Sequence, residues 1–245
     1  MIRRSVAVPP LAPPSFGNYL RSLVTSGVYY PLNEGGGTVA RDLGPNARHG
    51  AYTGVTLAQP GLVGPAASFD GINDDVTVAN HASLAIGTGE FSIVCLFQIR
   101  TISAAAHTLV YKRGEPNVNP TNMGFFLFLN GSGAGSTLSL LTDNGADAAV
   151  IATSDAALVA GKWYLAVAVR VGTTCTLWLN GVAQTTTATQ AGDLTNTTAL
   201  QFGYQATLGT NPADGWIQHA ALLPARALNA YEIGRLARLA RVGPP

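Results

Sequence analysis

The sequence predicts an all-β protein, a two-sheet antiparallel jelly-roll sandwich with a short N-terminal helix and a C-terminal helix. From Val28 to about residue 223, short runs of β-branched and aromatic residues alternate with glycine-rich turns, which indicates a sandwich rather than βαβ units. Hydrophobic residues make up 47% of the chain, enough for one substantial core. We therefore expect one domain over residues 17–245, preceded by an extended arm over residues 1–16.

The arm is predicted from its five prolines, because proline fixes φ and removes the amide donors that helices and central strands need. Residues 17–26 have an apolar edge and are expected to form one or two helical turns. Near the C-terminus, Asn229 and Glu232 have the spacing of a capping box. An apolar stripe at helical spacing follows them and predicts a helix over residues 229–241.

The clearest strands are expected from period-two alternation and from turn residues between the runs. Residues 91–99 are apolar on both faces, which is typical of a central strand covered on both sides or of one that lines a shallow groove. Asn180-Gly181 predicts a tight hairpin turn because both residues tolerate positive φ. The predicted strands are residues 76–78, 91–99, 108–112, 124–129, 137–142, 148–153, 163–171, 174–179, 199–204 and 215–223.

Charge is scarce and unevenly placed. Charged residues are only 11% of the chain and the net charge is +1, so the surface suits neutral, hydroxylated or protein partners better than nucleic acid. Both ends are basic, and if they lie together they form a docking face for an acidic partner; solvated surface arginines are the alternative. The arginines expected to dock a partner are Arg3, Arg4, Arg235, Arg238 and Arg241.

No signal peptide is expected, because the residues after Met1-Ile-Arg-Arg contain no apolar run of sufficient length. We expect no membrane insertion, since no apolar stretch is long enough to span a bilayer. Cys95 and Cys175 both lie in apolar strand patterns, where buried free thiols are the default, and the sequence leaves open whether they pair.

Several segments, in order from about residue 17 to residue 240, resemble the concanavalin A-like, laminin-G-like superfamily. The segment that begins Tyr30-Pro-Leu-Asn-Glu resembles the family's opening motif, and Ser68-Phe-Asp-Gly-Ile-Asn-Asp-Asp-Val-Thr-Val resembles its F-D-G signature. Leu109-Val-Tyr-Lys, Gly161-Lys-Trp, Leu177-Trp-Leu-Asn-Gly and Arg226-Ala-Leu-Asn-Ala-Tyr-Glu-Ile are similar to its later motifs. The resemblance implies two packed antiparallel sheets.

The resemblance also allows a calcium ion at the rim, for which Asp42 and Asn46 stand at matching positions. A late stretch that often supplies an acid in the family is Gly215-Trp-Ile-Gln-His here, so Gln218 and His219 replace both carboxylates. The alternative is that Asp42 caps the Gly44-Pro45 turn with its own side chain. No other cofactor is expected.

Nothing in the sequence predicts catalysis. Glycosidases of the superfamily need two carboxyl groups at a defined separation, and no strand carries acids in the E-x-D-x-x-E pattern. Asp74 and Asp75 are adjacent, so on a strand they point to opposite faces. No nucleophile elbow, metal-binding helix or phosphate loop occurs, and the four histidines lack ligand spacing.

The candidate binding surface is a rim formed by the turn at residues 70–75 and the loops at residues 113–122 and 205–214, since loops on a rigid sandwich commonly carry recognition. Trp216 and Tyr204 are candidates for stacking on a sugar ring; the alternative is that both complete the core. The remaining candidate ligand residues are Asp70, Asn73, Asp74 and Asp75.

Three functions stay open. The preferred one is a non-catalytic structural or binding module, a surface-exposed virion component (capsid decoration or tail-associated protein) that docks through its basic termini and works as an oligomer within the assembly. This step is an analogy with phage proteins that carry such domains. It implies synthesis in the cytoplasm and exposure on a virion or cell surface. The alternatives are a carbohydrate-binding module that mediates adhesion to glycans and a degenerate glycosidase-like enzyme.

Overall fold

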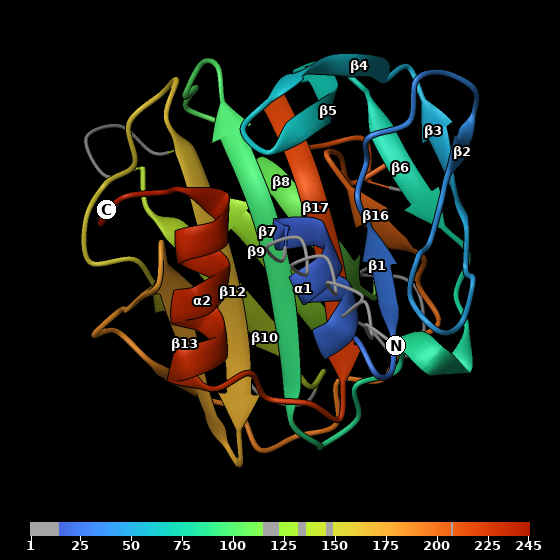
Figure 1. Ribbon diagram of the computed structural model, residues 1–245. Coiled ribbons are helices and arrows are strands. Elements are labelled where there is room, and N and C mark those ends of the chain that lie inside the picture. Colours follow the sequence, from blue (N-terminus) through green and yellow to red (C-terminus); the bar gives the residue numbers. More distant parts are fainter. Residues whose placement is uncertain (1–14, 115–122, 132–135, 146–148, 207) are drawn as a thin grey trace, which may run out of the picture.

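Two antiparallel sheets stacked face to face form the protein (Figure 1). The computed structural model describes residues 15–114, 123–131, 136–145, 149–206 and 208–245. The first sheet has nine strands: β1 (Val28–Tyr30), β4 (Thr56–Gly61), β5 (Gly64–Asp70), β7 (Phe91–Ile99), β12 (Trp163–Val171), β13 (Thr174–Leu179), β14 (Val182–Ala183), β15 (Ala188–Thr189) and β17 (Asp214–Pro224). The second has eight: β2 (Val39–Ala40), β3 (Gly50–Thr53), β6 (Asp75–Val78), β8 (His107–Arg113), β9 (Gly124–Leu129), β10 (Leu138–Asp143), β11 (Val150–Thr153) and β16 (Leu200–Phe202).

The sandwich prediction is confirmed, and every strand predicted above is present with ends shifted by at most a few residues. The predicted strands omitted β1 to β5, β14 and β15. These strands are short or, as in the β4–β5 hairpin, rich in proline and glycine, so they lack an alternating pattern. The Asn180-Gly181 turn between β13 and β14 has φ of 51° and 87°, as the hairpin prediction requires.

Two apolar clusters lie on the two faces of the first sheet. The larger cluster fills the space between the sheets and contains Phe91, Ile93, Cys95 and Phe97 from β7. The other faces of β7 and β12, with Val94, Leu96, Leu165 and Val167, belong to a second cluster under the helices. β7 is thus a central strand covered on both sides. Cys95 and Cys175 are both buried and free, and burial raises the pKa of each thiol.

Two α-helices, α1 (Phe16–Leu23) and α2 (Ala230–Ala240), lie over the outer face of the first sheet (Figure 1), and a 3-10 turn, η1 (Ala82–Leu84), follows β6. α2 has the predicted capping box and buries the predicted stripe of Ile233, Leu236, Ala237 and Ala240. α1 begins inside the range predicted for the arm, because the Ser15 side chain accepts from the Asn18 amide and Phe16 is buried. Neither helix has the length that crossing a bilayer requires, and the described residues hold no other candidate span.

A bulge divides β17 into two halves. Gln218 is opposite Leu96 and Ala221 is opposite Val94, so two residues of β17 face one residue of β7. His219, in the bulge, has a φ of 55° and donates its amide to Pro31 O at 3.1 Å. Before the bulge β17 pairs with β5, and after it β17 pairs with β1.

Two buried cations fasten loops to the sandwich. The Arg170 guanidinium donates to the carbonyl oxygens of Gly87 at 2.6 Å, Gly89 at 2.8 Å and Gly192 at 3.2 Å. The Lys112 ammonium donates to four oxygens of Asn80, Asn196 and Thr198 at 2.7 to 3.3 Å. Burial lowers the pKa of Lys112 to about 8. Each cation supplies donors to several loop oxygens at once; Gly87 O also accepts from the Leu194 amide and Asn196 Oδ1 from the Thr198 amide.

Candidate functional site

A row of polar and aromatic side chains crosses the first sheet on the face that carries the helices, and Trp163 at one end of the row also packs against the apolar cluster under them. Cross-strand pairing places Ser68 opposite Trp216, Trp216 opposite Gln98, and Gln98 opposite Trp163. Neighbouring strands lie about 4.8 Å apart, so the two indoles are roughly 10 Å apart with the Gln98 amide between them. All four side chains are half-buried. We call this row the tryptophan row.

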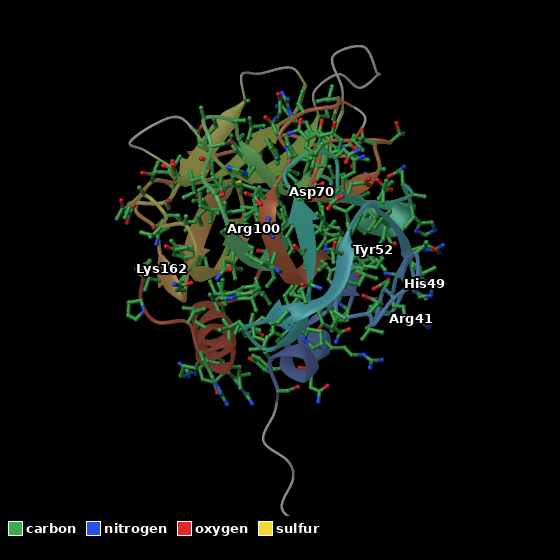
Figure 2. All side chains as sticks on the ribbon, turned by 90° about the horizontal axis from the view of Figure 1, so that it is seen from above. Arg41, His49, Tyr52, Asp70, Arg100 and Lys162 are labelled. Atoms are coloured by element: carbon green, nitrogen blue, oxygen red, sulfur yellow. The ribbon has the colours of Figure 1, made fainter. Side chains whose placement is uncertain are left out.

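Charged side chains border the tryptophan row at the end of β7. The Arg100 guanidinium lies over the Trp216 ring at 4.3 Å, donates to Ser68 Oγ at 3.0 Å and forms an ion pair with Asp214. Asp214 is opposite Asp70 on β5. The predicted candidates Asp70 and Trp216 therefore lie close together on neighbouring strands, and Arg100 contacts both Trp216 and Asp214. In the view of Figure 2, Arg100 lies between Lys162 and Asp70 at this end of the molecule.

A cavity of about 290 Å³ adjoins the other end of the row, where Trp163 lies beside Lys162, Asn180 and the C-terminal residues 241–245. Leu62, at the tip of the β4–β5 hairpin, closes its far side. Gln218 fixes this hairpin: its Nε2 donates to Gly64 O and Pro65 O at 2.9 and 2.8 Å, and its Oε1 accepts from the Val63 amide at 3.2 Å. Gln218, which stands where the resemblance leads one to expect a carboxylate, therefore holds the β4–β5 hairpin in place beside the site.

Sequence reasoning missed Gln98, Arg100 and Trp163 as site residues. The signal was present, because alternation along residues 91–99 puts Gln98 on the same face as Val94 and Leu96. Its Nε2 donates to Gly161 O at 2.6 Å, whereas its Oε1 accepts no hydrogen bond within the part of the chain that the structure describes. What the sequence could not supply was the register that aligns this strand with Trp216 and Trp163.

Of the other rim candidates, Asp74 and Asp75 bond to groups within residues 70–77. Asp74 is buried and accepts from the Asp70 amide at 3.0 Å, while Asp75 is buried and accepts from Thr77 Oγ1 at 2.5 Å. Burial and then the Asp70 charge raise the pKa of Asp74. Asn73 is exposed, and Tyr204 is half-buried in the β16–β17 loop; neither Tyr204 nor Trp216 belongs to an apolar cluster.

The predicted rim needs one correction, because Arg113, where the 113–122 loop begins, lies away from the other two loops. β8 runs antiparallel to β16, so its start, at His107, lies near the 205–214 loop, and Thr108 donates to Asn211 O at 3.1 Å. Arg113, at the end of β8, lies at the opposite end of the sheet. Residues 115–122 fall outside the described residues.

Asp42 and Asn46, the candidates for a calcium ion, are engaged with the backbone. The Asp42 carboxylate accepts from the amides of Tyr29, Gly44 and Arg48, each at 2.8 Å, and Asn46 donates to Gly27 O at 2.7 Å. These contacts are those of the turn-capping alternative. Within the described residues, no three His, Cys, Asp or Glu side chains are grouped as metal ligands.

The arginines expected to dock a partner lie on the helical face. α1 and α2 pack together, with the Arg235 guanidinium 4.2 Å from the centre of the Tyr19 ring. Arg21, Arg238 and Arg241 are exposed and line one cavity between the helices. Arg3 and Arg4 fall outside the described residues.

Sequence comparison places the chain in a family. A profile of the concanavalin A-like lectin/glucanases superfamily, of laminin-G type, matches residues 70–234. The chain belongs to this superfamily. A comparison with curated proteins found no match to the chain.

Solved structures agree with the family and establish the fold. The binding domain of Paraclostridial Mosquitocidal Protein 1 is 15% identical, with a TM-score of 0.67. The match covers 89% of the present chain and 52% of the toxin domain. The botulinum neurotoxin serotype D ligand binding domain in complex with N-acetylneuraminic acid is 13% identical, with a TM-score of 0.65 over 90% and 52%. A Trypanosoma rangeli sialidase is 13% identical, with a TM-score of 0.63 over 87% and 32%. The chain thus spans about half or less of these proteins.

Proposed function

We propose that the protein is a non-catalytic binding module that holds a glycan on the tryptophan row. The observation that carries this proposal is the placement of Trp216, Gln98 and Trp163 in one line across three strands, with all three side chains half-buried. Indole faces pack on the C–H faces of sugar rings, and the Gln98 amide, Arg100 and Asp214 supply hydrogen-bond partners for hydroxyl groups. Because Arg100 lies over Trp216, Trp163 is the indole that stacks on the sugar.

The low charge of the chain and the family support this reading. A surface made mostly of Thr, Asn, Gln, Ser and Gly matches a neutral, hydroxylated ligand. The serotype D neurotoxin domain was solved in complex with N-acetylneuraminic acid, and another neighbour is a sialidase. Both findings concern those proteins, and they support a sugar as the ligand class.

The carboxylates support a binding role rather than hydrolysis. Glu34 accepts from the Arg41 amide at 2.7 Å and from Tyr52 Oη at 2.6 Å, and Glu232 closes the capping box of α2 and pairs with Arg226. Asp214 pairs with Arg100, and Asp70 accepts from the Ile72 amide at 2.8 Å. A glycosidase needs one carboxyl group to deliver a proton and another to attack or activate water.

A glycan array, run with calcium and with a chelator, tests the proposal. We expect binding to at least one glycan class and a loss of about tenfold in affinity in Trp163→Ala, since a buried aromatic contact at a binding site is worth a kcal/mol or more. Tyr231→Ala is the matched control, because Tyr231 is an exposed aromatic residue on α2, outside the row. Silence of the array in both conditions, or equal binding by Trp163→Ala, contradicts the proposal.

A second function follows from the helical face. We infer that the module is a surface-exposed virion component, a capsid decoration or tail-associated protein, held in an oligomeric assembly through its basic termini. The supporting observation is that α1 and α2 pack together and carry Arg21, Arg235, Arg238 and Arg241 on one side of the sandwich. Such a face complements an acidic protein surface.

Deletion of residues 1–14 tests the attachment. The deletion must end before Ser15, because Ser15 caps α1 and Phe16 is buried. We expect the truncated chain to keep its melting temperature and to be missing from purified particles. Normal incorporation of the truncated chain rules out attachment through the arm.

A further inference from the structure

A cavity of about 660 Å³ lies between α1, the end of α2 and the β4–β5 hairpin. Figure 1 shows the two helices next to each other over the first sheet, on the face that contains this cavity. The helices contribute Phe16, Asn18, Arg21, Arg238, Leu239 and Arg241 to its wall. Leu62 and Val63 come from the hairpin tip, and Tyr29 and His219 lie at its base.

The charge of the wall is positive on two sides. Arg21 comes from α1, Arg238 from α2 and Arg241 from the C-cap of α2, and among the described residues no Asp or Glu lines the cavity. Among the described residues, the ion pairs involve Arg100, Arg113 and Arg226, so none of the three cavity arginines has a carboxylate partner. Three unpaired cations around one open cavity repel one another, and an anion placed between them gains from all three.

The first turn of α1 adds amide donors to the same wall. Ser15 Oγ accepts a hydrogen bond from the Asn18 amide. The amides of Phe16 and Gly17, in the first turn, have no acceptor inside the helix. Amides at a helix N-terminus, together with the helix dipole, favour negative charge. This terminus therefore acts in the same direction as the three arginines.

The base of the cavity is rigid and depends on a glycine. Tyr29 Oη and His219 Nδ1 are hydrogen-bonded at 2.7 Å directly below the α1 terminus. A Cβ atom at Gly17 would lie 2.9 Å from Tyr29 Oη and 3.2 Å from the His219 ring, so only glycine lets the helix terminus approach this pair. The cavity is thus part of the packed structure and is formed before any ligand arrives.

We propose that this cavity binds a small ligand with at least two carboxylate or phosphate groups. Its volume lies in the range of small-molecule sites. Arginine recognises planar carboxylates and phosphates through paired N–H donors, and arginines on two helices provide for two such groups. Leu62, Val63 and Leu239 line an apolar side that accommodates the carbon skeleton of the ligand. The proposal uses none of the residues of the tryptophan row, so it holds whether or not a glycan binds there.

Isothermal titration calorimetry of the full chain with citrate and with inorganic phosphate tests the proposal, in sodium chloride of constant ionic strength. We expect both anions to bind, citrate more tightly, and each of the variants Arg21→Gln and Arg238→Gln to weaken binding by about tenfold or more. Because Arg21 and Arg238 are exposed, neither variant is expected to change the melting temperature of the free protein.

Arg235→Gln is the matched control. It removes the same charge from the same helix, but the Arg235 guanidinium lies on the Tyr19 ring and does not line the cavity. Retained citrate binding in this control, with loss in Arg21→Gln and Arg238→Gln, supports the site. Heat signals that sodium chloride alone reproduces, or citrate affinities equal in all four proteins, overturn it.

Discussion

Replacing His219 with asparagine is expected to remove the contribution of His219 to the pH dependence of stability between pH 6.5 and 4. Burial lowers the pKa of His219 from 6.5 to about 4. Between these two values the unfolded chain binds a proton that the folded chain does not, so the free energy of unfolding falls as the pH falls. Above pH 6.5 the stabilisation from His219 is fully present. Below pH 4 His219 is protonated in both the folded and the unfolded state, so it adds no further slope.

The size of the effect follows from the same two pKa values. Their difference, at about 1.4 kcal/mol for each pKa unit, amounts to about 3 kcal/mol over the window. Asparagine tolerates the positive φ of residue 219 better than most residues do. It loses the bond to Tyr29 Oη and the contact with the Phe16 ring, which lowers stability by about 1–2 kcal/mol at every pH.

Urea unfolding of both proteins, followed by tryptophan fluorescence in steps of pH, measures the two contributions separately. Burial also lowers the pKa of His107, so the wild-type slope contains a second histidine and the difference between the proteins isolates His219. His81→Asn serves as control, because it makes the same substitution at a half-buried position that caps η1. Parallel pH profiles for wild type and His219→Asn refute the reasoning.

Three further predictions concern buried groups. Arg170→Met should lower the free energy of unfolding by about 3 kcal/mol, because Gly89 O and Gly192 O lose the Arg170 guanidinium as their donor and Gly87 O keeps only the Leu194 amide; normal stability in chemical denaturation contradicts it. Lys112→Met should cost a similar amount, about 3 kcal/mol, and should increase hydrogen exchange near Thr198; an unchanged exchange pattern argues against the loop-fastening role. Cys95 and Cys175 should resist alkylation in the native protein and react fully in denaturant, and rapid labelling of the folded chain would show that the thiols are accessible.

The sequence predicted those parts of the fold that local chemistry determines. Alternation along residues 91–99 assigned both faces of β7 correctly, and Asn229 with Glu232 predicted the capping box of α2. It did not predict the β4–β5 hairpin, whose strands are held by cross-strand pairing and by the Gln218 side chain rather than by their own pattern.

The candidate site was predictable only in part. Trp216 and Asp70 were identified from residue type and loop position, and they do adjoin each other through Asp214. Trp163 and Gln98 join Trp216 only through the register of three strands that are far apart in the chain, and one sequence does not specify such long-range pairing. The error at Arg113 has the same origin, because the direction of β8 relative to β16 decides at which end of the sheet Arg113 lies.

The bulge at His219 reverses the alternation of side chains along β17. Upstream, the even-numbered Trp216 and Gln218 face outward, whereas downstream the odd-numbered Ala221 and Leu223 face the helices. Deletion of one residue here would bring Leu222 under α1 and push its neighbours into the opposite layer, so we expect an insertion or deletion here to be more disruptive than the substitution His219→Asn. Since β5 pairs with the upstream half and β1 with the downstream half, a substitution near Trp216 leaves the strand register beneath the helices unchanged.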